Sequence, residues 1–132
     1  MPYCQGMNYI AGMVMLKTEN PAVAYSIYCS TIEKLFLPIF IDNFSGMALK
    51  LYLLDRLIAI FHPDLSEHLK REMISPECYS VGWIITAFSS VYQHTEQSYL
   101  VDWFWERFVL WGWGEFYRLV LWLIQVHKVK IS

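Results

Sequence analysis

Apolar residues recur along most of the chain at the spacing of an α-helix, and short polar breaks separate these stretches. The pattern predicts helices at about residues 6–17, 21–36, 47–61, 65–70, 76–90, 98–110 and 115–128. Asn20-Pro21 and Ser75-Pro76 are helix-start signals, whereas Pro38 is expected to break the helix before it. No alternation of period two persists beside these stripes, so the sequence predicts an all-α fold, an irregular bundle of about seven helices.

The apolar positions also predict which helix faces meet the core. In the helix expected over 47–61, the core stripe would be Leu49, Leu53, Leu54, Leu57, Ile60 and Phe61. Its polar residues Lys50, Asp55 and Arg56 are expected in solvent. In the helix expected over 76–90, the core face would be Tyr79, Trp83, Ile84, Ala87 and Phe88.

The aromatic residues divide into two groups according to whether we expect them in the core or at the surface. We expect five of them to pack in the core: Trp83, Phe88, Trp105, Phe108 and Phe116. Four further tryptophans are harder to bury, and we expect some of them at the surface: Trp103, Trp111, Trp113 and Trp122.

The first predicted helix is preceded by the stretch Tyr3-Cys4-Gln5-Gly6-Met7-Asn8. Gly6 permits a tight turn and a close approach of other groups to the backbone. The Gln5 amide carries one acceptor oxygen and two N–H donors, which can orient a water molecule or a small polar ligand. The alternative is that Gln5 only caps the start of a core helix.

The composition of the chain disfavours several classes of function. The chain has 132 residues, enough for one domain, and 17% of them are charged against about 25% in ordinary soluble domains. A net charge of −2 and scattered Lys and Arg residues disfavour nucleic-acid binding. Three cysteines without a CxxC pair favour free thiols in a reducing, intracellular compartment. The histidines show no ligand spacing with them, so no metal or cofactor is expected.

An apolar chain of this kind raises the alternative of a membrane helical bundle. The uncharged run between Glu77 and Glu96 contains several polar residues, and its apolar centre is shorter than the ~20 residues that span a bilayer. The stretch from Tyr99 to Val126 is interrupted by acidic and basic residues, which favours amphipathic helices. We therefore expect no membrane span.

Several segments resemble one known family. Tyr3-Cys4-Gln5-Gly6-Met7 is similar to the tyrosine-x-glutamine-glycine-methionine motif of the TBC domain, the family of GTPase-activating proteins for Rab GTPases. Four later segments follow in the family's order: 63–69 with His68-Leu69, 83–89 with Trp83 and Phe88-Ser89, 105–112 with Trp105 and Gly112, and 116–121. Glu106 stands where the family usually has aspartate.

The resemblance implies a TBC-like all-α domain over residues 1–132, incomplete at its N-terminus. It implies that Gln5 is catalytic, inserted in trans to orient the water that hydrolyses GTP, and that Tyr3, Gly6, Met7 and Asn8 support this motif or bind the GTPase. The implied partner is a GTP-bound Rab, with no cofactor. The implied location is the cytoplasm, peripheral to membranes through partners.

The family's arginine finger lies in an isoleucine-x-x-aspartate-x-x-arginine segment upstream of the glutamine. None of the chain's four arginines, Arg56, Arg71, Arg107 and Arg118, lies in such a segment. We therefore expect this chain as given to lack the arginine finger. The alternative function is a catalytically inactive TBC-like module that binds partners or serves as a scaffold within a larger protein assembly.

Overall fold

The computed structural model of the chain describes residues 6–41, 44–90 and 98–131, and within them every regular element is a helix. The longer helices are α1 (Met7–Met15), α2 (Pro21–Thr31), α4 (Ser45–Phe61), α5 (Pro63–Arg71), α7 (Ser98–Trp111) and α8 (Trp113–Ile131). The shorter ones are α3 (Leu37–Phe40), α6 (Val81–Thr86), the π-helical turn η1 (Ile32–Phe36) and the 3₁₀ turn η3 (Pro76–Cys78). The prediction of an all-α fold is confirmed.

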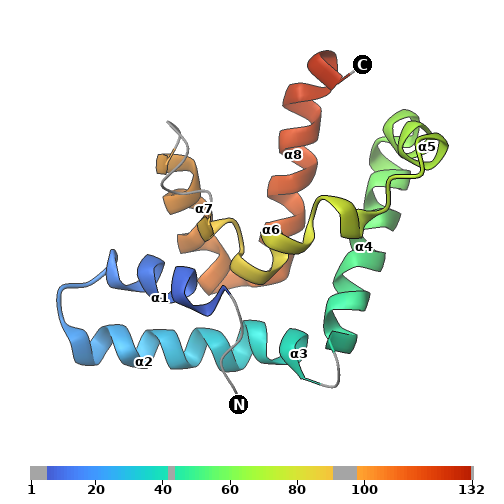
Figure 1. The fold of residues 1–132 in the computed structure, drawn as a ribbon. Coiled ribbons are helices and arrows are strands. Elements are labelled where there is room, and N and C mark those ends of the chain that lie inside the picture. The colour runs from blue at the N-terminus through green and yellow to red at the C-terminus, as the bar shows by residue number, and fades with distance from the viewer. Residues whose placement is uncertain (1–5, 42–43, 91–97, 132) are drawn as a thin grey trace.

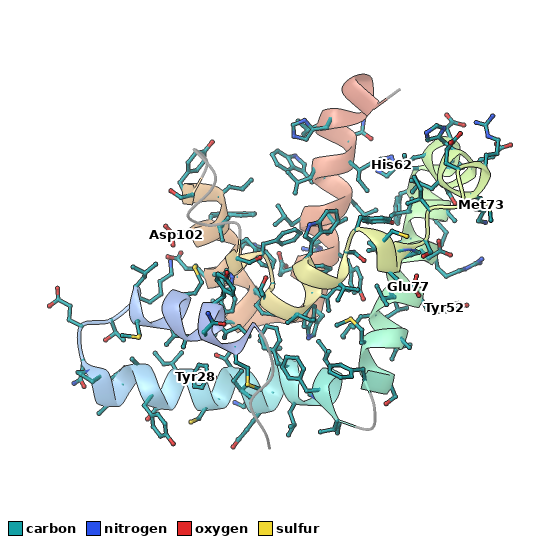
Figure 2. The ribbon with its side chains drawn as sticks, in the orientation of Figure 1. Tyr28, Tyr52, His62, Met73, Glu77 and Asp102 are labelled. Carbon is teal, nitrogen blue, oxygen red and sulfur yellow. The ribbon has the colours of Figure 1, made fainter. Side chains whose placement is uncertain are left out.

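Helix α6 lies at the centre of the arrangement (Figure 1). It contacts α1 on one side and α4 on the other, while α1 packs along α2. Helices α7 and α8 pack against each other, and α8 also contacts α4. His62 joins α4 to α5, and its Nε2 lies 3.3 Å from the carbonyl oxygen of Leu121 on α8 (Figure 2). The short α6 segment therefore lies between α1 and α4, two helices of the first half of the chain.

The core is built largely of aromatic rings. The fully buried aromatic side chains are Phe36, Phe104, Phe108 and Phe116. Phe108 stacks on Phe104 with ring centroids 5.3 Å apart, and Phe88 stacks on Phe116 at 5.2 Å. Of the five aromatic residues expected in the core, four are buried, and Trp83 is only half-buried. Trp83 lies at the edge of the cluster, with its ring 5.6 Å from that of Phe88.

The predicted core face of α4 was correct at Leu54 and in part at Leu57, which is half-buried against the core, but wrong at the other four positions. The buried positions are Met47, Leu51, Leu54 and Ile58, whereas Leu49, Leu53, Ile60 and Phe61 are exposed. Apolar residues occur on several sides of this helix, so periodicity alone allows more than one face. Lys50, expected in solvent, is half-buried with Nζ 4.9 Å from the Trp113 ring centroid, and loss of water lowers the pKa of its ammonium group.

Pro38 does not end the helical rod that begins at Pro21. The chain passes from α2 through η1 into α3, where Pro38 occupies a first-turn position. At this transition the Leu37 N–H donates to the carbonyl of Ile32, five residues back. A proline in the first turn lacks only an N–H that the new helix leaves unpaired, so the rod continues.

The single helix expected over 76–90 is instead two short elements, η3 and α6. Helix α6 ends at Thr86, because Ala87 and Phe88 adopt left-handed backbone angles. The side chains of Ile84, Ala87 and Phe88 are buried as expected. No helix in the described part of the chain is long and apolar enough to cross a membrane.

Candidate functional site

The start of α1 is packed directly onto the end of α6. Gly6 precedes the helix, is buried and has φ 108°, a conformation that L-residues rarely adopt. Its carbonyl accepts a hydrogen bond from the Tyr9 N–H at 3.1 Å. A Cβ at Gly6 would lie 2.5 Å from Cγ2 of Ile85 and 3.3 Å from Cγ2 of Thr86. Both the backbone angle and the close approach therefore require glycine here.

The remaining residues of the glutamine motif divide into three groups. Tyr3 and Gln5 lie outside the described residues. Met7 is 5% exposed and belongs to the core cluster, so its side chain anchors α1 in the domain. Asn8 is exposed on the first turn of α1, next to Tyr9, which is also exposed. Among these residues, only Asn8 has a described side chain in a position to contact a partner.

The end of α6 is a backbone turn made of two non-glycine residues. Ala87 has φ 46° and Phe88 has φ 66°, and each such residue carries a conformational cost of about 1–3 kcal/mol. The Phe88 N–H donates to the carbonyl of Trp83 at 3.1 Å, which closes the helix end. The indole N–H of Trp105 on α7 donates to the carbonyl of Ala87 at 2.9 Å, and this bond is buried.

A small polar network stabilises the same turn. Oγ1 of Thr86 donates to the carbonyl of Gly82 at 2.8 Å and lies 3.1 Å from Oγ of Ser90. Oγ of Ser89 donates to the carbonyl of Thr86 at 2.7 Å. These side chains replace backbone partners that the helix loses where it ends. The turn is thus fixed by hydrogen bonds from its own residues and from α7.

The opposite end of α1 is also tied to α7. Nζ of Lys17 lies 3.0 Å from Oδ1 of Asp102 and 3.5 Å from Oε1 of Glu106. Figure 2 shows Asp102 on α7, on the side that faces α1. A partly exposed ion pair contributes at most about 1 kcal/mol. It nevertheless links α1 to the helix that also carries Trp105.

A second feature is a groove of about 740 Å³ between α7 and α8. Its lining includes the aromatic residues Tyr99, Trp103 and Trp122 and the leucines Leu100 and Leu119. At one end Glu115 binds Arg107 at 3.1 Å and Arg118 at 3.3 Å. The expectation of exposed tryptophans is confirmed, because Trp103, Trp111 and Trp122 are 53%, 69% and 52% exposed, while Trp113 is half-buried.

The side chains that commonly bind metals do not gather in the described residues. No group of three or more His, Cys, Asp or Glu side chains there could hold a metal ion. Cys29 is half-buried and Cys78 is exposed, and both are free thiols.

A sequence model of the Rab-GTPase-TBC domain family matches residues 1–132, the whole of the chain. The chain belongs to this family. Its relatives include the GTPase-activating protein GYP5 of Saccharomyces cerevisiae, 33% identical over 88 residues, and TBC1 domain family member 4 of Mus musculus, 30% identical over 92 residues. Drainin of Dictyostelium discoideum is 33% identical over 87 residues.

These matches cover 66% to 67% of this chain but only 10%, 7% and 20% of the three relatives. The chain therefore corresponds to a small part of each of these proteins. No solved structure matches it at a significant level.

Within this TBC-family chain, three of the segments that carry the resemblance meet in space. Gly6 lies against Ile85 and Thr86 of the tryptophan-to-serine segment, and Ala87 accepts a hydrogen bond from Trp105 of the next segment. Sequence reasoning missed the left-handed pair Ala87-Phe88 and the indole hydrogen bond. It assigned Trp105 to packing only, because neither residue type nor spacing shows where an indole N–H donates.

Proposed function

We propose that this TBC-family chain acts on a GTP-bound Rab GTPase and supplies Gln5 in trans to orient the hydrolytic water. The observation that supports this most is the packing of Gly6, the residue directly after Gln5, against the braced end of α6. A rigid support of this kind is what a group acting in a transition state needs, since small displacements cost large factors in rate. The yeast relative is named a GTPase-activating protein, which agrees with this activity.

The chemistry of the proposal follows from GTP hydrolysis itself. The reaction requires a positioned water molecule and compensation of the charge that develops on the phosphoryl oxygens. The oxygen of the Gln5 amide would accept a hydrogen bond from the attacking water, and its N–H groups would donate to the reacting phosphate. The chain would therefore be a regulator that accelerates hydrolysis by its partner. Tyr3, Met7 and Asn8 would support the motif or contact the GTPase.

We propose that the second group, an arginine that neutralises the developing charge, is supplied by a segment other than residues 1–132. Arg107 and Arg118 are held by Glu115 in the α7–α8 groove, and Arg56 and Arg71 lie on α4 and α5. An arginine finger contributes about 10³–10⁵ in rate, so the chain alone should stimulate hydrolysis very little. In a cell, the complete activator would act in the cytoplasm on Rab-dependent vesicle trafficking, peripheral to membranes through its partners.

The alternative proposal is a TBC-like binding or scaffold module without activity, part of a larger assembly. The exposed aromatic groove between α7 and α8 favours this alternative, since an apolar surface with a charged edge suits a protein partner. The two proposals differ in one respect: only the first predicts that Gln5 changes the rate of GTP hydrolysis.

The test is Gln5→Ala in the full-length protein, measured by single-turnover phosphate release from a panel of GTP-loaded Rab proteins. We expect the stimulated rate to fall roughly 10²–10³-fold, the usual loss for one positioned polar group in a transition state. Gln125→Ala, the same change at an exposed position on α8, is the matched control and should leave the rate unchanged. Equal rates for the two variants would refute the proposal in favour of the scaffold.

A further inference from the structure

The left-handed turn at Ala87-Phe88 is held by a hydrogen bond from Trp105 on α7, a residue to which the mechanism above gives no role of its own. Both residues have positive φ without being glycine, so the turn needs contacts from outside to persist. The Trp105 indole N–H supplies one such contact, donating to the Ala87 carbonyl at 2.9 Å in a buried environment. In that environment a lost partner would leave the carbonyl without water to replace it.

The same turn limits the position of Gly6. The residues directly before Ala87, Ile85 and Thr86, are the ones that a Cβ at Gly6 would strike. Any relaxation of the end of α6 would therefore change the surface on which the start of α1 rests. The route from the Trp105 indole to Gly6 runs through Ala87 and then through the side chains of Ile85 and Thr86, which are β-branched and therefore stiff at χ1.

We propose that Trp105 is a positioning residue for the glutamine motif, because its indole N–H fixes the end of α6 on which Gly6 is seated. This inference rests on the proposed function, in which Gln5 must be held in a defined place. Trp105 itself touches no reacting atom. It acts through the Ala87 carbonyl, at the end of the helix whose Ile85 and Thr86 side chains lie against Gly6.

The chain offers a closely matched control in Trp113. Its indole N–H also donates to a backbone carbonyl at 2.9 Å, that of Leu35, far from α6 in the sequence. Both indoles pack edge-on against Phe108, with ring centroids 5.3 Å and 5.0 Å away. Trp105→Phe and Trp113→Phe therefore remove the same kind of donor beside the same Phe108 ring, from a buried indole and a half-buried one respectively, but only Trp105 bonds to the turn next to Gly6.

A rescue variant separates positioning from general packing. Ala87→Gly gives a residue that adopts a positive φ readily, which removes the backbone strain at one of the two left-handed positions and makes the turn less dependent on the indole bond. The experiment measures single-turnover GTP hydrolysis by a Rab GTPase with the full-length protein carrying Trp105→Phe, Trp113→Phe, or Trp105→Phe with Ala87→Gly. Both the maximal rate and the half-saturating concentration are recorded, and Gln5→Ala is run beside them.

We expect Trp105→Phe to lower the maximal rate roughly 10- to 100-fold, as for a displacement of about 1 Å, with the half-saturating concentration unchanged. Trp113→Phe should keep the rate, and Ala87→Gly should restore part of what Trp105→Phe loses. If both tryptophan variants lose rate equally, or Ala87→Gly restores nothing, Trp105 serves packing alone and the inference is overturned.

Hydrogen exchange makes the inference independent of the GTPase assay. Trp105→Phe should speed exchange of the Tyr9 and Phe88 amides roughly fivefold, the effect of one lost hydrogen bond, and leave the His62 amide at the end of α4 unchanged. If Gln5→Ala leaves hydrolysis unaffected, the proposed function fails, and the exchange rates alone decide the positioning role. Unchanged Tyr9 and Phe88 exchange would then overturn it.

Discussion

Replacing Gly6 with alanine is the strongest test of the packing between the start of α1 and the end of α6. The residue has φ 108° and ψ −21°, where a side chain costs about 1–3 kcal/mol. The new Cβ would lie 2.5 Å from Cγ2 of Ile85, and such overpacking typically costs about 1–3 kcal/mol more. We therefore expect Gly6→Ala to lower the free energy of unfolding by about 2–6 kcal/mol.

The matched control is Gly12→Ala in the middle of α1. Gly12 is exposed, and a Cβ there would meet nothing within 4 Å. Alanine favours a helix interior over glycine, so this variant should gain about 0.5–1 kcal/mol. Urea unfolding followed by circular dichroism at the helix band measures both changes on the same chain.

A second variant separates the two costs at Gly6. Ile85→Ala removes the methyl group that the new Cβ would strike, but leaves the backbone angle as it is. In this background Gly6→Ala should cost less, with a coupling of about 1 kcal/mol or more between the two positions. Equal stability of Gly6→Ala and the unmodified chain, or no coupling with Ile85→Ala, would refute the packing described between the start of α1 and the end of α6.

Two further predictions concern the core and its titration. Phe108→Ala should lower the free energy of unfolding by about 3–5 kcal/mol because the ring is fully buried, and Trp83→Ala by about 1–2 kcal/mol because Trp83 is half-buried; a larger loss at Trp83 in urea melts would contradict this ranking. Burial raises the pKa of Tyr117 to about 12, and its hydroxyl donates to the Lys50 carbonyl at 2.9 Å. Because the unfolded tyrosine ionises near its ordinary value of 10, its contribution is complete below pH 10 and is lost as pH rises towards 12. Tyr117→Phe should therefore flatten the fall in stability between pH 10 and 12, and an unchanged slope would count against this account.

The sequence was sufficient for most of the long helices and for a start that depends on local capping. Asn20 was expected to cap a helix that begins at Pro21, and its Oδ1 accepts hydrogen bonds from the N–H groups of Ala22 and Val23 at 3.0 and 3.4 Å. Local signals of this kind involve residues two or three positions apart, so they can be read without the fold. The same holds for the buried aromatic residues of α7, where Trp105 and Phe108 lie on one helical face.

The predictions that failed are those that depend on contacts between residues far apart in the sequence. In α4 the choice between the face of Leu54 and Ile58 and that of Leu53 and Ile60 depends on where α5, α6 and α8 pack. At the early end of α6 the Ala87 carbonyl accepts a hydrogen bond from Trp105, a residue 18 positions away in the sequence. Of the candidate site, Gly6 was correctly expected at a close approach, but the residues that approach it could not be foreseen from spacing.

The central claim is that Gln5 acts in the transition state of GTP hydrolysis, and affinity for a transition-state mimic tests it most directly. The measurement compares Gln5→Ala with the unmodified full-length protein, for binding to a Rab carrying GDP and aluminium fluoride and to the same Rab carrying a non-hydrolysable GTP analogue. The account predicts a loss of roughly 10²-fold for the aluminium fluoride complex and little change for the analogue, since an interaction made only in the transition state adds nothing to ground-state binding. Equal affinities of the two proteins for the aluminium fluoride complex would contradict it.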